Sequence, residues 1–302
     1  MSINTEKILH IKEALVYIKK NKLNIQSATK YLYNISQDVP VVIVTCGPSL
    51  KLIPKEQIIV LANKCVLIAV KQAHDYLDGS EVIHLINQYN LKKYNYKNKD
   101  ICVMSTFDQA CGNKIFSRSD LAFPHDINLF KSNKQDLLDG RLAITRDFNK
   151  YMLINNVERP WGPGIVLELA LYLAVHMGAK NVYLIGYDLA SPVNKVDQLI
   201  KFYNKNKSFS IQGITDFFFE KLPKKFKPIG EKIKYSLGLI YNKPSSMDRD
   251  ENQVLVDSSA DLYKWLKNKG ISLYICSDNS YVSRDIPRKN ITEIRSDIEN
   301  MK

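Results

Sequence analysis

Two glycine turns that directly follow apolar runs are the parts of this sequence best suited to bind an anion. They are TCGPSL (45–50) and GYD (186–188). A strand that enters a glycine turn leaves backbone N–H groups free to hold a phosphate, and Ser49 and Asp188 add a hydroxyl and a carboxylate. Neither GxGxxG nor a GxxxxGK motif followed by Ser or Thr occurs, which argues against a standard dinucleotide site and a P-loop kinase. A plain turn and a helix N-cap are the alternatives.

A third glycine turn, WGPG (161–164), opens the most apolar helical segment of the chain, 164–178. The first N–H groups of a helix have no partner within it and lie at the positive end of its dipole, which suits a phosphate. A tight turn with proline near the helix start is the alternative interpretation.

The sequence offers one histidine with the character of a general base and no convincing metal site. His125 stands beside Asp126 in a polar context, which favours acid–base chemistry. His84 and His176 lie in apolar segments and are expected to be structural. The DxD tripeptide 248–250 has the form of a sugar-transferase metal site, but such short patterns arise by chance, and we assign no metal to it.

Composition places the chain among ordinary globular proteins with anionic partners. Of its 302 residues, 45% are hydrophobic and 25% charged, and the net charge is +12, which favours nucleotides, sugar phosphates, nucleic acid or an anionic membrane surface. The five cysteines show no CxxC motif and are expected to be reduced thiols. Glu6 and Glu13 interrupt the N-terminal apolar stretch, and 164–178 is too short to span a bilayer, so we expect a soluble cytoplasmic protein.

Short apolar runs that alternate with helical patterns predict the fold class. The runs lie at 41–45, 65–70, 82–86, 101–105, 181–186 and 271–276, and the clearest helices at 164–178 and 259–269. Nearly continuous β-branched runs are typical of parallel strands buried on both faces. We therefore expect an α/β fold with a doubly wound, mainly parallel, Rossmann-like sheet, whose ligands bind beyond the carboxyl ends of the strands.

The same patterns divide the chain into four parts. They are an N-terminal helical arm (1–37), a nucleotide-binding core (38–189), a basic lid or insertion (190–255) and a C-terminal completion of the core (256–302). The arm carries an apolar helical stripe, which we expect to pack on its own domain or on a partner subunit, with a membrane-surface helix as the alternative. The insertion is rich in lysine and aromatic residues and could cover an anionic substrate or lie on a membrane; a solvated face is the alternative.

Two of the glycine turns resemble a known pair of related families. GPSL (47–50) and PGIVLELALYLAVHMGAKNVYLIGYD (163–188) resemble the bacterial sialyltransferases that modify lipooligosaccharides and the MptE-like group, which includes archaeal pterin pyrophosphokinases and motility accessory factors. The resemblance covers Val41–Asn90, Arg159–Leu189 and Asp257–Ser280.

The resemblance implies a metal-independent, inverting glycosyltransferase that moves a CMP-activated ulosonic acid, of sialic acid, nonulosonate or Kdo type, without a further cofactor. The nucleotide-binding residues it implies are Cys46, Gly47, Pro48, Ser49, Lys71, Asn87, Gly162, Pro163, Gly164, Gly186 and Asp188. Arg159 is expected to contact the acceptor or the phosphate. The family's phosphate-binding tyrosines do not follow GYD here, so Tyr235 or Tyr241 from the insertion would replace them.

This chain departs from the sialyltransferase pattern at three informative positions. Cys46 and Lys71 stand where asparagine is found, and Val256 stands where the family has its histidine base. The base implied for this chain is therefore the adjacent Asp257 or His125.

The implied partners are a CMP-sugar and a glycan or lipid-linked glycan acceptor, with peripheral contact at the inner membrane, a homo-oligomer, and no nucleic acid. Two other functions are compatible with the turns. One is an MptE-like diphosphotransferase that uses ATP and Mg²⁺, and the other is a nucleotide-binding protein without catalysis.

Overall fold

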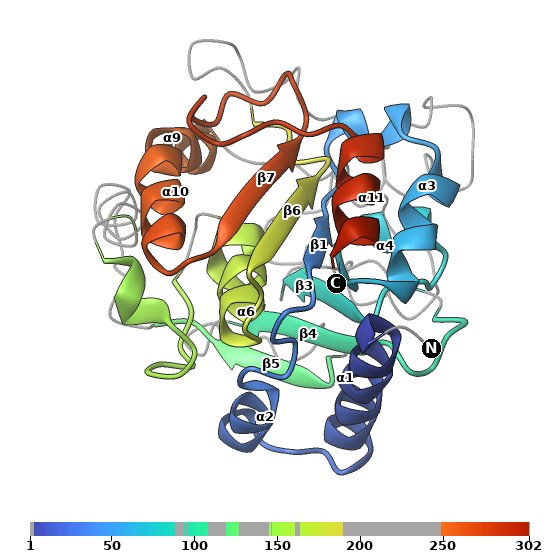
Figure 1. The fold of residues 1–302 in the computed structure, drawn as a ribbon. Helices are drawn as coiled ribbons and strands as arrows, with labels where there is room; N and C mark the ends of the chain where they lie inside the picture. Colours follow the sequence, from blue (N-terminus) through green and yellow to red (C-terminus); the bar gives the residue numbers. More distant parts are fainter. Residues whose placement is uncertain are drawn as a thin grey trace, which may run out of the picture.

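A single parallel sheet organises the protein (Figure 1). The computed structural model describes residues 3–87, 94, 96–107, 119–126, 145, 147–160, 164–189 and 249–301. The strand order is β5-β4-β3-β2-β1-β6-β7, and every neighbouring pair is parallel. The strands are β1 (Val41–Val44), β2 (Val66–Val70), β3 (Ile83–Asn87), β4 (Cys102–Phe107), β5 (Leu121–Pro124), β6 (Asn181–Ile185) and β7 (Ser272–Cys276).

The central strands are buried on both faces, as their continuous apolar runs predict. In β1, Val41 and Ile43 join the core on one face of the sheet, whereas Val42 and Val44 join the core on the other. Side chains of successive strand residues point to opposite faces, so a strand covered on both sides must be apolar throughout. The predicted Rossmann-like α/β arrangement is confirmed.

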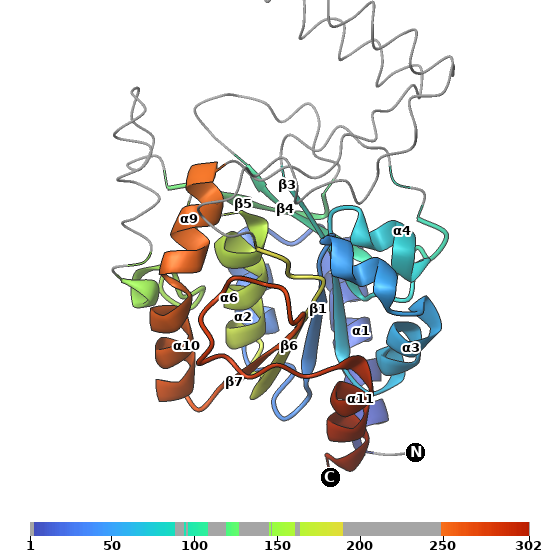
Figure 2. The ribbon, with the colours of Figure 1, turned by 90° about the horizontal axis from the view of Figure 1, so that it is seen from above.

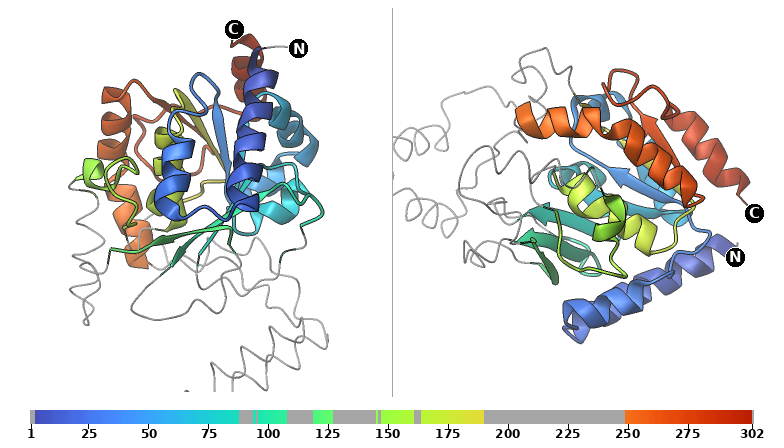
Figure 3. Two further views of the ribbon diagram at one scale, coloured as in Figure 1. Left: turned by 90° about the horizontal axis from the view of Figure 1, so that it is seen from below. Right: turned by 90° about the vertical axis from the view of Figure 1, so that its left-hand side faces the viewer.

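Helices cover both faces of the sheet (Figures 2 and 3). One face carries α1 (Ile3–Lys20), α2 (Ile25–Leu32), α6 (Leu171–His176) and α10 (Ser259–Asn268), and α9 (Arg249–Asp257) precedes α10. The other face carries α3 (Lys55–Ile59), α4 (Ala73–Leu77) and α11 (Ile291–Asn300).

The N-terminal arm packs on its own domain. The stripe residues Ile8, Ile11, Leu15 and Ile18 are at most 3% exposed and belong to the core beneath the sheet, which confirms the first of the expected arrangements. The arm is two helices rather than one, because Asn24 caps α2 by accepting a hydrogen bond from the Ser27 N–H.

Three local predictions need correction or lie outside the described residues. The sequence runs did not predict β5, a four-residue edge strand with alternating burial. The second and third residues of the DxD tripeptide begin α9, and its first residue lies outside the described residues. Of the predicted insertion 190–255, only 249–255 are described, and they belong to α9.

The strand order creates a topological switch point beside β1. The chain proceeds from β1 outward through β2, β3, β4 and β5, and then returns to pair β6 with the opposite edge of β1. The loops that follow β1 and β6 therefore diverge, and in open α/β sheets the crevice between such loops is where ligands bind.

Candidate functional site

The turn after β1 is held against the turn after β6. The Gly47 N–H donates to the Gly186 carbonyl at 2.9 Å, and the Thr45 hydroxyl donates to the same oxygen. A β-carbon on Gly47 would lie less than 3.0 Å from that carbonyl and from the Asp188 carboxylate. Only glycine fits this approach. Pro48–Leu52 then form a 3₁₀ helix with proline in its first turn.

The carboxylate of Asp188 joins the ends of three strands. Its Oδ2 accepts from the Ser49 backbone N–H at 2.6 Å, and its Oδ1 accepts from the Ser277 hydroxyl directly after β7. Ser277 was not predicted from the sequence. It could have been found as a hydroxyl residue that directly follows the apolar run 271–276. The backbone N–H groups of Gly47 and Ser49, which the sequence predicted to be free for a phosphate, are therefore already bonded to the Gly186 carbonyl and the Asp188 carboxylate.

The cradle at the switch point is formed by Gly47, Ser49, Gly186 and Asp188. The Ser49 hydroxyl is its unsatisfied polar group. Its Oγ is buried and has no hydrogen-bond partner among the described residues. An unpaired buried hydroxyl costs about 1–3 kcal/mol, so such groups are commonly completed by water or ligand. In the same turn, Cys46 is partly exposed and Pro48 is exposed.

Lys71 and Asn87 lie at the carboxyl ends of the next two strands, on the β5 side of β1. Lys71 has a positive φ of 50°, which is uncommon for a residue with a β-carbon. Its N–H donates to Leu85 O at 2.8 Å and its carbonyl accepts from His84 Nε2 at 2.8 Å. Asn87 pairs with Thr106 of β4 in the sheet register; its side chain is outside the described part.

The WGPG turn is described only from its last residue onward. Gly164 has φ 79°, and its carbonyl accepts from the Glu168 N–H at 2.9 Å. Val166–Ala170 form a π-helical segment that continues into α6, a widening of the helix that sequence periodicity did not predict. Gly162 and Pro163 lie outside the described residues.

A polar cluster lies under the carboxyl ends of β4 and β5. The Glu168 Oε2 is 3.5 Å from His125 Nε2 and accepts from the Thr106 hydroxyl at 3.3 Å. His125 is 4% exposed and Glu168 6%. The sequence analysis selected His125 but not Glu168, because the carboxylate stands alone in an apolar helix and pairs only through the tertiary fold.

Arg159 is a structural residue in this structure rather than one presented to an acceptor or phosphate. Its side chain is fully buried, and its guanidinium donates to the carbonyls of Tyr151, Asn156 and Val157. Burial lowers the pKa of the guanidinium to about 9. Its backbone extends the β5 ladder by bridging to His125, so Arg159 supports the segment that carries the candidate base.

The other candidate base is exposed and bound within its own helix. Both Asp257 oxygens accept from the Gln253 side-chain amide one turn earlier, at 2.7 Å. Tyr235 and Tyr241, predicted to contact the phosphate, lie outside the described residues. The structure thus brings together Gly47, Ser49, Gly186 and Asp188, and it separately brings His125 to Glu168.

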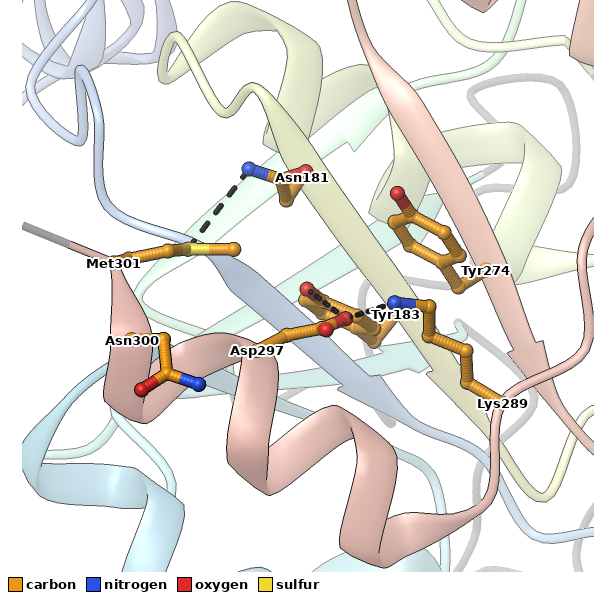
Figure 4. A pocket seen from close by; sticks show the side chains of 7 residues that line it. All are labelled: Asn181, Tyr183, Tyr274, Lys289, Asp297, Asn300 and Met301. Atoms are coloured by element: carbon orange, nitrogen blue, oxygen red, sulfur yellow. Dashed lines mark hydrogen bonds and ion pairs between the residues drawn. The ribbon is translucent and has the colours of Figure 1, made fainter.

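An open pocket of about 270 Å³ lies between α11 and the sheet (Figure 4). Asp297 accepts from the Tyr183 hydroxyl at 3.1 Å and pairs with Lys289, whose ammonium lies 4.5 Å from the centre of the Tyr274 ring. Asn181, the first residue of β6, also lines it. This pocket is therefore reached from the amino-terminal half of β6, away from the cradle at the strand's carboxyl end.

Comparison with protein-family models, curated proteins and solved structures found no match for this chain. Among the described residues, no helix combines the length and apolarity needed to cross a bilayer.

Proposed function

We propose that this protein transfers a CMP-activated ulosonic acid to a hydroxyl of a cell-surface or lipid-linked glycan, with inversion at the transferred carbon. The observation that carries the proposal is the cradle at the β1–β6 switch point, where Gly47, Ser49, Gly186 and Asp188 converge although about 140 residues separate the two turns. The resemblance of these two turns to the sialyltransferases supplies the choice of donor.

The cradle suits a nucleotide monophosphate for physical reasons. The absence of a side chain at Gly47 lets the Gly186 carbonyl and the Asp188 carboxylate approach the backbone of this turn. The Ser49 hydroxyl gains a hydrogen bond when a phosphate or ribose oxygen reaches it. Asp188, held by two donors, can accept from a ribose hydroxyl with a remaining lone pair. The excess of 12 positive charges favours approach of the anionic donor.

In the proposed reaction, the acceptor oxygen attacks the ketal carbon of the ulosonic acid and the bond from that carbon to the phosphate oxygen breaks. CMP leaves with the bonding electron pair. The proton of the acceptor hydroxyl passes to His125. General-base assistance of this kind is worth about 10²–10⁴ in rate, so its loss would slow turnover and leave nucleotide binding intact.

A thermal-shift panel tests nucleotide choice. CMP, CDP, UDP, GDP and ATP are each added with and without Mg²⁺, and a ligand at about 100 times its Kd adds about 2.7 kcal/mol to the unfolding free energy. Stabilisation by CMP or CDP without metal supports the proposal. A response only to ATP or UDP with Mg²⁺ refutes it, and ATP with Mg²⁺ would indicate the diphosphotransferase.

A pair of serine variants locates the binding site. Ser49→Ala should leave the Tm of the free protein unchanged or raise it, because the buried hydroxyl has no partner to lose, and should reduce the shift caused by CMP. Ser36→Ala is the control: its buried hydroxyl donates to Met177 O at 2.8 Å, distant in sequence from both turns, so the free protein should lose stability while the CMP shift persists. An unchanged CMP shift in Ser49→Ala would place the nucleotide elsewhere.

A further inference from the structure

A buried carboxylate faces the candidate base at the carboxyl edge of the sheet. Glu168 lies 3.5 Å from His125 and 3.3 Å from the Thr106 hydroxyl, measured at its Oε2. We propose that Glu168 is the positioning residue of His125, fixing the imidazole with its proton on Nε2 so that Nδ1 is the atom that accepts the proton of the acceptor hydroxyl. This inference rests on the proposed function and names which carboxylate serves its base.

Hydrogen-bond accounting at the imidazole assigns the two nitrogens. Glu168 as a carboxylate can only accept, so the Nε2 that faces it must donate. The neutral ring then carries a lone pair on Nδ1. That nitrogen is buried and has no partner within the described residues. A proton acceptor without a donor is the state expected of a base that waits for its substrate.

The local helix geometry is what brings the carboxylate to this place. Glu168 is the middle residue of the π-helical segment Val166–Ala170, whose other members are apolar core residues. A π-helical turn inside a helix is rare and is frequently found at functional sites. Burying a lone carboxylate in such a segment is costly, and partners from β4 and from the residue after β5 offset that cost.

The charges around His125 come from several elements. Its neighbour Asp126 pairs with Lys150 at 2.9 Å and faces the Tyr151 hydroxyl at 3.5 Å. Arg159 bridges to His125 only through the backbone, and its guanidinium is bound by carbonyls. Thus Asp126 forms an ion pair with Lys150, and Glu168 is the carboxylate that contacts the His125 ring.

The distance to the cradle suits an extended donor. Thr106 is on β4, three strands from β1 in the sheet order, which corresponds to roughly 14 Å along the sheet. Both sites are at carboxyl ends of parallel strands. The attacked carbon is bonded to the phosphate oxygen, so His125 can serve as its base only when the cytidine ribose occupies the cradle and the phosphate extends along this edge toward β4.

The tautomer can be measured without any substrate. In protein labelled with ¹⁵N-histidine, two-bond couplings identify which nitrogen of His125 carries the proton, with His125→Gln assigning its signals among the five histidines. We expect Nε2–H in the unmodified protein and a mixture or the opposite tautomer in Glu168→Gln. An Nδ1–H imidazole, or signals that Glu168→Gln leaves unchanged, would overturn the inference.

The catalytic half is tested by a double-mutant cycle on transfer from the CMP-sugar. His125→Ala should lower kcat about 10²–10⁴-fold, and Glu168→Gln about 10-fold or more, with the acid limb of the pH–rate profile moved to lower pH because the neighbouring negative charge is lost. In the His125→Ala background, Glu168→Gln should have no further effect. Additive losses would overturn the positioning role. Glu168→Asp, which keeps the charge, should recover part of the activity.

A second buried pair supplies the matched control. Glu81 is 1% exposed and pairs with the Nδ1 of His74, a residue of α4. Glu81→Gln should resemble Glu168→Gln in its effect on Tm, yet leave kcat and the pH profile unchanged. Lack of any CMP-sugar transfer together with lack of CMP binding would refute the proposed function itself, whereas the ¹⁵N experiment still decides the assignment of His125 and Glu168.

Discussion

Replacing Gly47 by alanine isolates the close contact between the turns that follow β1 and β6. Gly47 has φ −72° and ψ 160°, a conformation that alanine adopts readily. If there were space, the substitution would stabilise the protein by about 0.4–1 kcal/mol, because it restricts the unfolded chain. The structure predicts the opposite sign, because the added β-carbon would lie less than 3.0 Å from the Gly186 carbonyl and the Asp188 carboxylate.

The cost follows from the bonds that must break when the turns separate. The Gly47 N–H to Gly186 O bond contributes about 1 kcal/mol, and the bond from the Ser49 N–H to the Asp188 carboxylate contributes about 1.5–3 kcal/mol. After the gain from the unfolded chain is subtracted, we expect a net loss of about 2–3 kcal/mol, or a fall in Tm of about 3–5 °C. Nucleotide binding should be lost as well.

Gly270→Ala is the control, because this glycine has space for a β-carbon but a backbone conformation that alanine adopts poorly. No atom lies within 4 Å of a β-carbon at Gly270, but its φ is +72°, so its expected loss of about 1–2 kcal/mol comes from backbone strain alone. Differential scanning calorimetry with and without CMP measures both variants. Gly270→Ala should retain the CMP-induced shift. A rise in Tm for Gly47→Ala would refute the close approach and with it the geometry of the cradle.

Three further predictions concern the scaffold. Leu15→Ala should cost about 2–5 kcal/mol in urea unfolding, whereas Leu9→Ala should cost almost nothing, because Leu9 in α1 is 49% exposed; equal effects would contradict the packing of the arm. Arg159→Lys should lose about 2–3 kcal/mol, because an ammonium cannot reproduce a guanidinium bound to three carbonyls; unchanged urea unfolding would contradict this buried network. Burial lowers the pKa of His176 below its ordinary value, so the unfolded state binds the proton more readily and stability should fall between about pH 7 and pH 5. His176→Gln, whose amide can still donate to Thr29 O, should reduce that slope, and an identical Tm–pH slope in both proteins would count against the shift.

The sheet could be predicted because local pattern determines its strands. Each of the six predicted runs coincides within two residues at either end with a strand, since continuous β-branched sequence suits burial on both faces. The edge strand β5 could not be found this way: Leu121–Pro124 is short, alternates in burial and ends in proline. The sequence predicted a mainly parallel sheet but not the order of its strands.

The sequence predicted those site residues that lie in recognisable local motifs, and it missed those that are identified only by a partner far away in the chain. Gly47 and Gly186 lie in recognisable turns, and the structure places them in contact. Ser277 and Glu168 act through partners more than 40 residues away, and no spacing rule connects such pairs. Arg159 was predicted to contact the acceptor or the phosphate, but in the structure its guanidinium binds backbone carbonyls.

The pairing of β1 with β6 also has a consequence for biosynthesis. Thr45 and Gly186 are 141 positions apart, so at about 5–20 residues per second the ribosome delivers the second turn about 7–28 s after the first. During that interval β2 can cover one edge of β1, while the other edge of this wholly apolar strand has no native partner. Unpaired apolar edges are templates for aggregation. We expect a chaperone that covers this edge to reduce aggregation of the nascent chain until β6 arrives.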